Sequence, residues 1–234
     1  MTAWGIVPVK ELVQSKTRLS PVLSPPERLA LSIYLCRRTL RVLGMVRSLA
    51  DIAVISPDPV VLEIAREEHC QPFLEERPAG LNRALAHVLG QALAFHVSVV
   101  MVVPIDLPLI QPEDLAAVLG LARLSAHGRH PLVIAPDRHG TGTNLMAFHL
   151  PASIELRYGR DSYKEHRAQC KEHNLTCFTL KHPHLALDLD LPADIDFLRK
   201  LNWSGELVSP PAKGFVGIDR AGTGLWNGIR KELV

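Results

Sequence analysis

The sequence predicts an α/β fold, a three-layer sandwich in which helices cover both faces of a mixed, mostly parallel sheet. Short apolar segments alternate with longer amphipathic ones along the chain, as in folds built from β–α units. The clearest signal is the segment 97–110, VSVVMVVPIDLPLI, in which residues 97–103 are all apolar or small. This run is too short to span a membrane and too rich in valine for a stable helix, so it predicts a strand buried on both faces.

The elements before this central strand follow from their apolar patterns. The predicted strands are short apolar runs that end in charged or proline-containing loops, at 4–9, 51–56 and 70–74. The predicted helices carry a broad apolar face, and they lie at about 27–43, 60–69 and 81–95.

The second half of the chain continues the alternation. Pro104 ends the central strand because it has no amide hydrogen, and Pro112 opens a helix at 112–126 with acidic residues in its first turn. Further strands are predicted at 131–135, 145–149, 175–180 and 186–191, and further helices at 162–172 and 192–201. We find no internal repeat. Residues 1–201 therefore form one predicted domain, and the glycine-rich but partly apolar 202–234 is predicted to be an arm packed on this domain or on a partner subunit.

Composition narrows the class of protein. The 234 residues are 47% hydrophobic and 21% charged, and the formal net charge is only +2, so neither a nucleic acid nor a membrane is an expected partner. Four cysteines are scattered without a C-x-x-C pair, and no secretory signal or membrane-length segment is present. We expect a cytoplasmic protein with reduced thiols.

Acidic residues at two distant places suggest a metal. Asp106 follows the central strand, at the sheet edge where α/β proteins bind ligands. Asp188 and Asp190 alternate with leucines in a predicted strand, so both carboxylates should emerge on one face, where they repel each other unless a cation lies between them. A solvated acidic edge strand explains the pair alone equally well, but the three carboxylates together favour a magnesium site for phosphates.

Three further features fit a bound anion without requiring one. Lys10, Lys16 and Arg18 lie in the loop after the first strand and indicate either a phosphate-binding loop or an ordinary solvated one. The glycines of GTGTN (140–144) fit close ligand approach or a simple hairpin turn. Gly159 and Ser162 fit an anion site at a helix start or a plain N-cap.

The histidines and nucleophiles point to no other chemistry. His182 and His184 are two residues apart, but with no third ligand nearby in the sequence we expect both to be surface residues. No order of serine, histidine and aspartate supports a hydrolase.

Six motifs occur together in one order, over about residues 3–201. They are PVK (8–10) with SKTRL (15–19), GLNRAL (80–85), PIDLP (104–108), PD (136–137) with GTGTN (140–144), YGRDS (158–162) and LDLD (187–190). Together they resemble the CofC/FbiD guanylyltransferases of coenzyme F-420 biosynthesis.

The resemblance implies a glycosyltransferase-A-like nucleotidyltransferase fold and a magnesium-dependent enzyme. Such an enzyme joins GTP to 2-phospho-L-lactate, phosphoenolpyruvate or 3-phospho-D-glycerate and releases pyrophosphate. By motif, the catalytic residues would be Asp106, Asp188, Asp190 and Lys10, of which the three aspartates would hold magnesium. The acid would contact Lys10, Thr143, Gly159 and Ser162, and the nucleotide would contact Lys16, Arg18, Gly80 and Asn82.

Two alternatives stay open. One is a related transferase acting on a sugar phosphate or molybdopterin, and the other is a nucleotide-binding module without activity. The apolar content of 202–234 also raises a homodimer as an expectation. The sequence does not select among the three acids.

Overall fold

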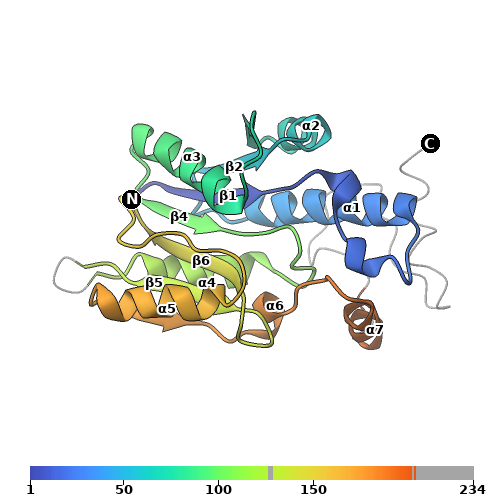
Figure 1. The fold of residues 1–234 in the computed structure, drawn as a ribbon. Coiled ribbons are helices and arrows are strands. Elements are labelled where there is room, and N and C mark those ends of the chain that lie inside the picture. Colours follow the sequence, from blue (N-terminus) through green and yellow to red (C-terminus); the bar gives the residue numbers. More distant parts are fainter. Residues whose placement is uncertain (126–128, 202, 204–234) are drawn as a thin grey trace.

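The computed structural model describes residues 1–125, 129–201 and 203 (Figure 1). Its middle layer is a seven-stranded sheet in the order β3-β2-β1-β4-β6-β5-β7. The strands are β1 (Ala3–Pro8), β2 (Asp51–Ser56), β3 (Gln71–Leu74), β4 (Val99–Val102), β5 (Leu132–Pro136), β6 (Thr143–His149) and β7 (Cys177–Thr179). Neighbouring strands are parallel except where β6 pairs with β4 and β5. The predicted mixed, mostly parallel sheet is confirmed.

Helices cover both faces of the sheet (Figure 1). Helices α1 (Pro25–Gly44), α2 (Pro59–Glu67) and α4 (Pro112–Ala122) contribute buried side chains to one core cluster, and α3 (Leu81–Ala94) and α5 (Ser162–Glu172) contribute to another. Two short helices follow, α6 (Pro183–Ala186) and α7 (Pro192–Lys200). No helix in the described part of the chain is both long enough and apolar enough to cross a membrane.

The central strand is buried on both sides, as its sequence predicts. Val99 and Met101 of β4 point into the cluster that contains α1 and α4, whereas Val100 and Val102 point into the cluster that contains α3. All four are 0–2% exposed. Because β4 is held between β1 and β6, its carboxyl end gives the loop that follows a fixed starting point.

The strand predicted at 186–191 is wrong. Residues 183–186 form α6, and 187–190 continue as an extended segment that joins no sheet. Leu187 and Leu189 are nonetheless buried, in a third cluster with side chains of α1 and α7. Of the predicted C-terminal arm at 202–234, only Trp203 lies among the described residues, and its ring packs edge-on against Tyr34 of α1.

Candidate functional site

Two acidic segments that are far apart in the sequence meet beside the carboxyl end of β4. The backbone N–H of Leu189 donates a hydrogen bond of 2.9 Å to the backbone carbonyl of Asp106. Leu189 and Leu187 point into the core, so the alternating Asp188 and Asp190 remain on the partly exposed side. The two carboxylates therefore share a face, although the segment is not a sheet strand.

Lys16 holds these two segments together. Its backbone lies in the left-handed region at φ 56° and ψ 29°, between two short 3₁₀ turns at Leu12–Gln14 and Thr17–Leu19. Its side chain is almost fully buried, and Nζ forms an ion pair with the carboxylate of Asp106 and donates a 2.7 Å hydrogen bond to the carbonyl of Leu189. A buried ammonium group thus contacts both acidic segments at once.

Arg18 makes a second, more exposed ion pair in the same loop. Its guanidinium lies 2.8 Å from Oδ2 of Asp190, and 71% of the Arg18 side chain is exposed to solvent. Such a pair contributes little to stability, so Arg18 is free to exchange this partner for an anion.

The carboxyl group of Asp188 experiences a different environment. Burial raises its pKa, and the nearby carboxylates of Asp194, Asp137 and Asp190 raise the pKa further. Among the described residues, no lysine, arginine or histidine forms an ion pair with Asp188. The position therefore concentrates negative charge that a cation would compensate.

Loop contacts from β5 and β6 position this acidic segment. The side-chain amide of Asn144 donates hydrogen bonds to the carbonyls of Leu185 (3.0 Å) and Ala186 (3.2 Å). Asp137 accepts hydrogen bonds from Thr141 and Gly142 in the intervening turn. Burial opposes ionisation of Asp137, but these hydrogen bonds lower its pKa below the ordinary value. The GTGTN motif thus forms a tight turn that supports α6.

A cavity of about 830 Å³ opens in front of these residues, a volume typical of sites for ligands of nucleotide size. Seven of the eleven predicted site residues line it: Lys10, Lys16, Arg18, Gly80, Asp106, Asp188 and Asp190. Gly80 precedes α3 with φ 94°, a conformation that favours glycine, so the residue before that helix borders the cavity without a side chain. The structure thus gathers the predicted cations and carboxylates around one space.

The other four predicted residues do not line this cavity and lie in a neighbouring network. Ser162 accepts a hydrogen bond of 3.0 Å from the backbone N–H of Thr143, whose hydroxyl lies 3.0 Å from Nδ1 of His166. The N–H of Ser162 donates to the carbonyl of Gly159. His166 does not appear among the predicted residues, because nothing in its local sequence distinguishes it from other helical histidines.

Asn82 links the cavity wall to this network. Its side-chain NH₂ group donates a hydrogen bond of 3.1 Å to the backbone carbonyl of Tyr158. Its side-chain carbonyl accepts a hydrogen bond of 2.8 Å from the backbone N–H of Tyr158. Both ends of the Asn82 amide are therefore engaged by the protein itself. The start of α3 and the loop before α5 are fixed relative to each other by this pair of bonds.

His182 and His184 lie at the surface, as the sequence predicts, but the fold supplies a third potential ligand that is distant from them in the sequence. Asp114 of α4 lies beside both of them in the folded chain. The sequence separates this aspartate from His184 by 70 residues, so spacing alone could not reveal it.

Comparison with known proteins identifies the family. The family model described as guanylyl transferase CofC-like matches residues 3–201. The chain belongs to this family. The phosphoenolpyruvate guanylyltransferase of Rubrobacter xylanophilus is 35% identical over 214 residues, which cover 91% of this chain and 100% of that protein. The 2-phospho-L-lactate guanylyltransferase of Methanocaldococcus jannaschii is 29% identical over 190 residues, which cover 81% and 79%.

A solved structure agrees on the fold of this CofC-like protein. A nucleotidyl transferase from Methanothermobacter thermautotrophicus aligns with a TM-score of 0.62 at 15% identity, over 86% of this chain and 97% of that one. The nucleotidyltransferase fold implied by the sequence resemblance is confirmed, and the protein is an enzyme of the nucleotidyltransferase class.

Proposed function

We propose that this CofC-like protein joins GTP to a three-carbon phosphorylated acid and releases pyrophosphate, in coenzyme F-420 biosynthesis. The observation that carries the proposal is the contact of Lys16 with both Asp106 and Leu189, because it assembles cations and carboxylates from three segments beside one cavity. The family and the names of its members supply the substrate class.

The chemistry needs positioning more than proton transfer. A phosphate oxygen of the acid attacks the α-phosphorus of GTP, a new P–O bond forms, and the bond from that phosphorus to the pyrophosphate oxygen breaks. The attacking group is already an anion, so no general base is required. The barrier lies in aligning two polyanions and stabilising the leaving pyrophosphate, which Lys16, Arg18 and Lys10 would do by charge.

We further propose that Asp106, Asp188 and Asp190 hold Mg²⁺. The residue types fit, because carboxylate oxygens are the ligands that Mg²⁺ prefers and all three residues line the cavity. Asp106 is paired with Lys16 and Asp190 with Arg18, and the three carboxylates do not converge to within 4.8 Å of one another, so a bound ion would have to draw them together and replace these pairs. When bound, the ion would neutralise phosphate charge. Lys16 and Arg18 would remain beside the triphosphate.

The remaining assignments are proposals of the same kind. We assign the acid substrate to Lys10 on the cavity wall and to Thr143, Gly159 and Ser162 in the network beside the cavity. We assign the guanine to the neighbourhood of Gly80, which lines the cavity, and Asn82, which does not. Since Asn82 already binds the backbone of Tyr158, its role would be to hold the residue before Gly159 in place.

Assembly and location are also proposed. We propose that two copies of the chain form a homodimer and that the enzyme works in the cytoplasm. Light scattering of the full chain after size exclusion tests the first point, because a monomer at micromolar concentration would contradict it.

An acceptor panel tests the reaction. Purified protein is incubated with Mg²⁺, each of the four nucleoside triphosphates, and 2-phospho-L-lactate, phosphoenolpyruvate or 3-phospho-D-glycerate, and pyrophosphate release is measured. We expect release only with GTP and at least one of these acids. Asp106→Asn and Asp188→Asn should abolish it, whereas the exposed Glu172→Gln on α5 should not.

The same panel separates the alternatives. Pyrophosphate release with a sugar phosphate or molybdopterin, and none with the acids, would favour a related transferase. Tight GTP binding without pyrophosphate release for any acceptor would favour a binding module.

A further inference from the structure

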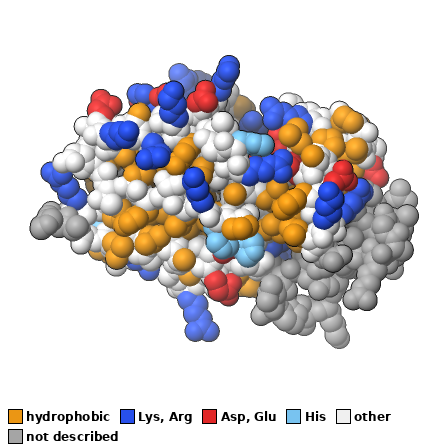
Figure 2. Space-filling view, turned by 90° about the horizontal axis from the view of Figure 1, so that it is seen from below, with side chains coloured by type: hydrophobic (Ala, Val, Ile, Leu, Met, Phe, Trp, Pro, Cys, Tyr) orange, Lys and Arg blue, Asp and Glu red, His pale blue; other side chains and the backbone are white. Residues whose placement is uncertain are grey.

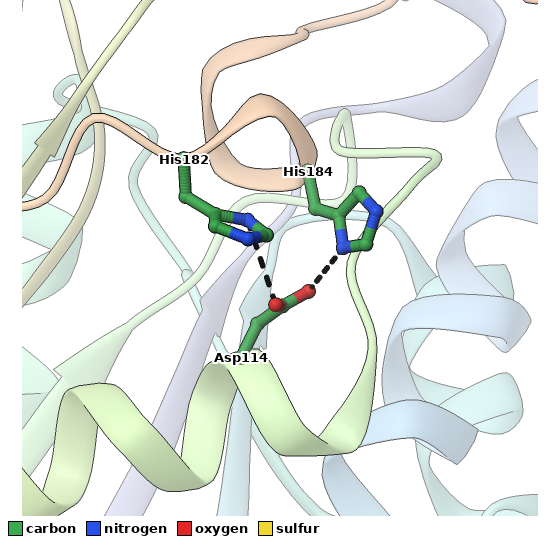
Figure 3. A group of neighbouring side chains, drawn as sticks. All are labelled: Asp114, His182 and His184. Atoms are coloured by element: carbon green, nitrogen blue, oxygen red, sulfur yellow. Dashed lines mark hydrogen bonds and ion pairs between the residues drawn. The ribbon is translucent and has the colours of Figure 1, made fainter.

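Asp114, His182 and His184 form a compact cluster at the surface (Figure 3). Nδ1 of His184 lies 2.9 Å from Oδ2 of Asp114, and Nδ1 of His182 lies 3.5 Å from Oδ1. One ligand atom from each residue lies within 4.8 Å of the others. None of the three residues lines the cavity of the candidate active site.

We propose that these three residues bind a borderline transition-metal dication such as Zn²⁺. Two imidazole nitrogens and one carboxylate are a common ligand set for such ions, whereas Mg²⁺ prefers oxygen ligands alone. Three protein ligands leave a coordination position for water. The proposed ion is therefore chemically distinct from the one assigned to Asp106, Asp188 and Asp190.

The carboxylate of Asp114 is held ready as a ligand. Its side chain is only 11% exposed, and its Oδ2 accepts a 2.9 Å hydrogen bond from the backbone N–H of Gln111 at the start of α4. Among the described residues, no lysine or arginine pairs with this carboxylate, and its charged neighbours are the two histidines. Because the carboxylate is already fixed and faces two imidazoles, less side-chain conformational entropy is lost when a metal ion binds.

The two histidines lie beside Asp114, but hydrogen bonds from the described residues do not engage all of their ring nitrogens. Nδ1 of His184 is within hydrogen-bond range of Asp114, but the 3.5 Å separation for His182 is longer than a good hydrogen bond. The two rings meet edge to face with centroids 4.7 Å apart, and 47% of the His182 side chain and 41% of the His184 side chain are exposed. Figure 2 shows histidine side chains on the face of the molecule seen from below. An ion from solvent can therefore reach them.

The cluster lies between α4 and α6, close along the chain to both acidic segments of the candidate active site. Asp114 belongs to the helix that follows the Asp106 loop, and His184 lies four residues before Asp188. An ion bound here would cross-link α4 to α6, the two elements next to the acidic segments. The site would thus fix the spacing of these segments from outside the cavity.

Direct zinc binding tests the proposal and does not depend on activity. The metal-free full chain is titrated with Zn²⁺ against a chromophoric chelator, in excess Mg²⁺ so that oxygen-ligand sites are occupied by that ion. We expect one Zn²⁺ per chain, and binding at least about 10-fold weaker for His182→Gln, His184→Gln or Asp114→Asn, because even outer-shell changes cost about 10- to 100-fold in metal affinity. Co²⁺ in place of Zn²⁺ should give visible absorption bands that the variants lack.

Controls separate this site from other ligands. His173→Gln removes an exposed histidine after α5 and should leave zinc affinity unchanged, as should Asp188→Asn in the cavity. Zinc should raise the melting temperature of the wild type and of His173→Gln, but not that of the double variant His182→Gln/His184→Gln, whose fold is checked by circular dichroism. Equal zinc affinity for the wild type and this double variant, or no binding to either, would overturn the proposal. If the three site variants lose zinc binding while neither the wild type nor any variant releases pyrophosphate, the zinc site is supported and the proposed function is refuted.

Discussion

The ammonium group of Lys16 contacts the carboxylate of Asp106, although 90 residues separate the two in the chain. The left-handed backbone of Lys16 turns its side chain inward, where it also reaches the carbonyl of Leu189. One side chain therefore sets the relative position of the loop after β4 and the segment after α6.

Replacing Lys16 distinguishes its charge from its backbone conformation. Both Lys16→Met and Lys16→Gly should lower kcat/KM at least about 100-fold, roughly 2.7 kcal/mol of transition-state stabilisation, because both remove the ammonium group. Glycine adopts φ 56° without strain, but it leaves the buried volume of the Lys16 side chain empty, whereas methionine fills it. The cavity costs about 2–5 kcal/mol and the relieved backbone strain returns only about 1–2 kcal/mol, so the methionine variant should be the more stable of the two in urea denaturation. Lys164→Met on the exposed side of α5 is the control. Retained activity in Lys16→Gly would show that only the turn matters.

Asp188→Asn should separate stability from metal binding. Because the pKa of Asp188 is raised in the folded state, its protonation stabilises the metal-free protein below about pH 4, the pKa of an unfolded aspartate, and this stabilisation is lost as the pH rises through the folded pKa. At pH 7 in EDTA the variant should therefore melt no lower than the wild type. Adding Mg²⁺ should raise the melting temperature of the wild type only. Asp196→Asn, which changes an exposed carboxylate of α7, should behave as the wild type.

Tyr158→Phe should stabilise the protein by about 1 kcal/mol. The hydroxyl of Tyr158 is buried without a hydrogen-bond partner among the described residues, and burial raises its pKa. Removing this hydroxyl removes the free-energy penalty of burying a polar group that has no hydrogen-bond partner. The matched control is Tyr163→Phe, which loses a 3.2 Å contact with Thr179 and should be destabilising. Urea denaturation of both variants measures the difference, and a loss of stability in Tyr158→Phe would refute the explanation.

His166 should make stability depend on pH below neutrality. Burial lowers the pKa of His166 to about 4, whereas an unfolded histidine titrates near 6.5. As the pH falls, His166 is therefore protonated in the unfolded chain before it is protonated in the folded protein. The free energy of unfolding decreases as the pH drops from about 6.5 towards 4, by on the order of 1–2 kcal/mol at pH 5. Burial also lowers the pKa of His149 to about 4, so the two residues act in the same pH range.

A variant isolates the share of His166. His166→Gln can keep an acceptor for the N–H of Arg157, which donates to Nε2 at 3.0 Å in the wild type. Its unfolding free energy should change less between pH 7 and pH 5 than that of the wild type. An unchanged pH profile would show that His166 is not the titrating group.

Much of the fold could be predicted because it depends on local pattern. The run of valines before Pro104 predicts a two-sided buried strand, and β4 is one. The prediction of a strand at 186–191 is wrong because the alternation of leucine and aspartate indicates an extended backbone but does not show whether that backbone pairs with a sheet. Leu187 and Leu189 are buried as the alternation requires, but against α1 and α7 and not within the sheet.

The candidate site can be predicted less completely, because many of its contacts join residues that are far apart along the chain. The cavity gathers Lys16 and Asp106, which follow predicted strands, and Asp188, which alternates with leucines, and these patterns can be noticed in the sequence. His166 and Asp114 carried no such signal. Each gains its significance only from partners that the fold brings from elsewhere, and single-sequence reasoning has no access to those pairings.

The alternation of leucine and aspartate at 187–190 has a wider consequence. Two of these side chains anchor the segment beneath α1 and α7, and the other two face the cavity, so one short stretch of backbone serves both purposes. Shortening either leucine would displace the carboxylates without altering any acidic group. We therefore expect inherited variation at the two leucines to be as restricted as at the two aspartates, and enzymes inactivated there would still retain every residue that contacts a substrate.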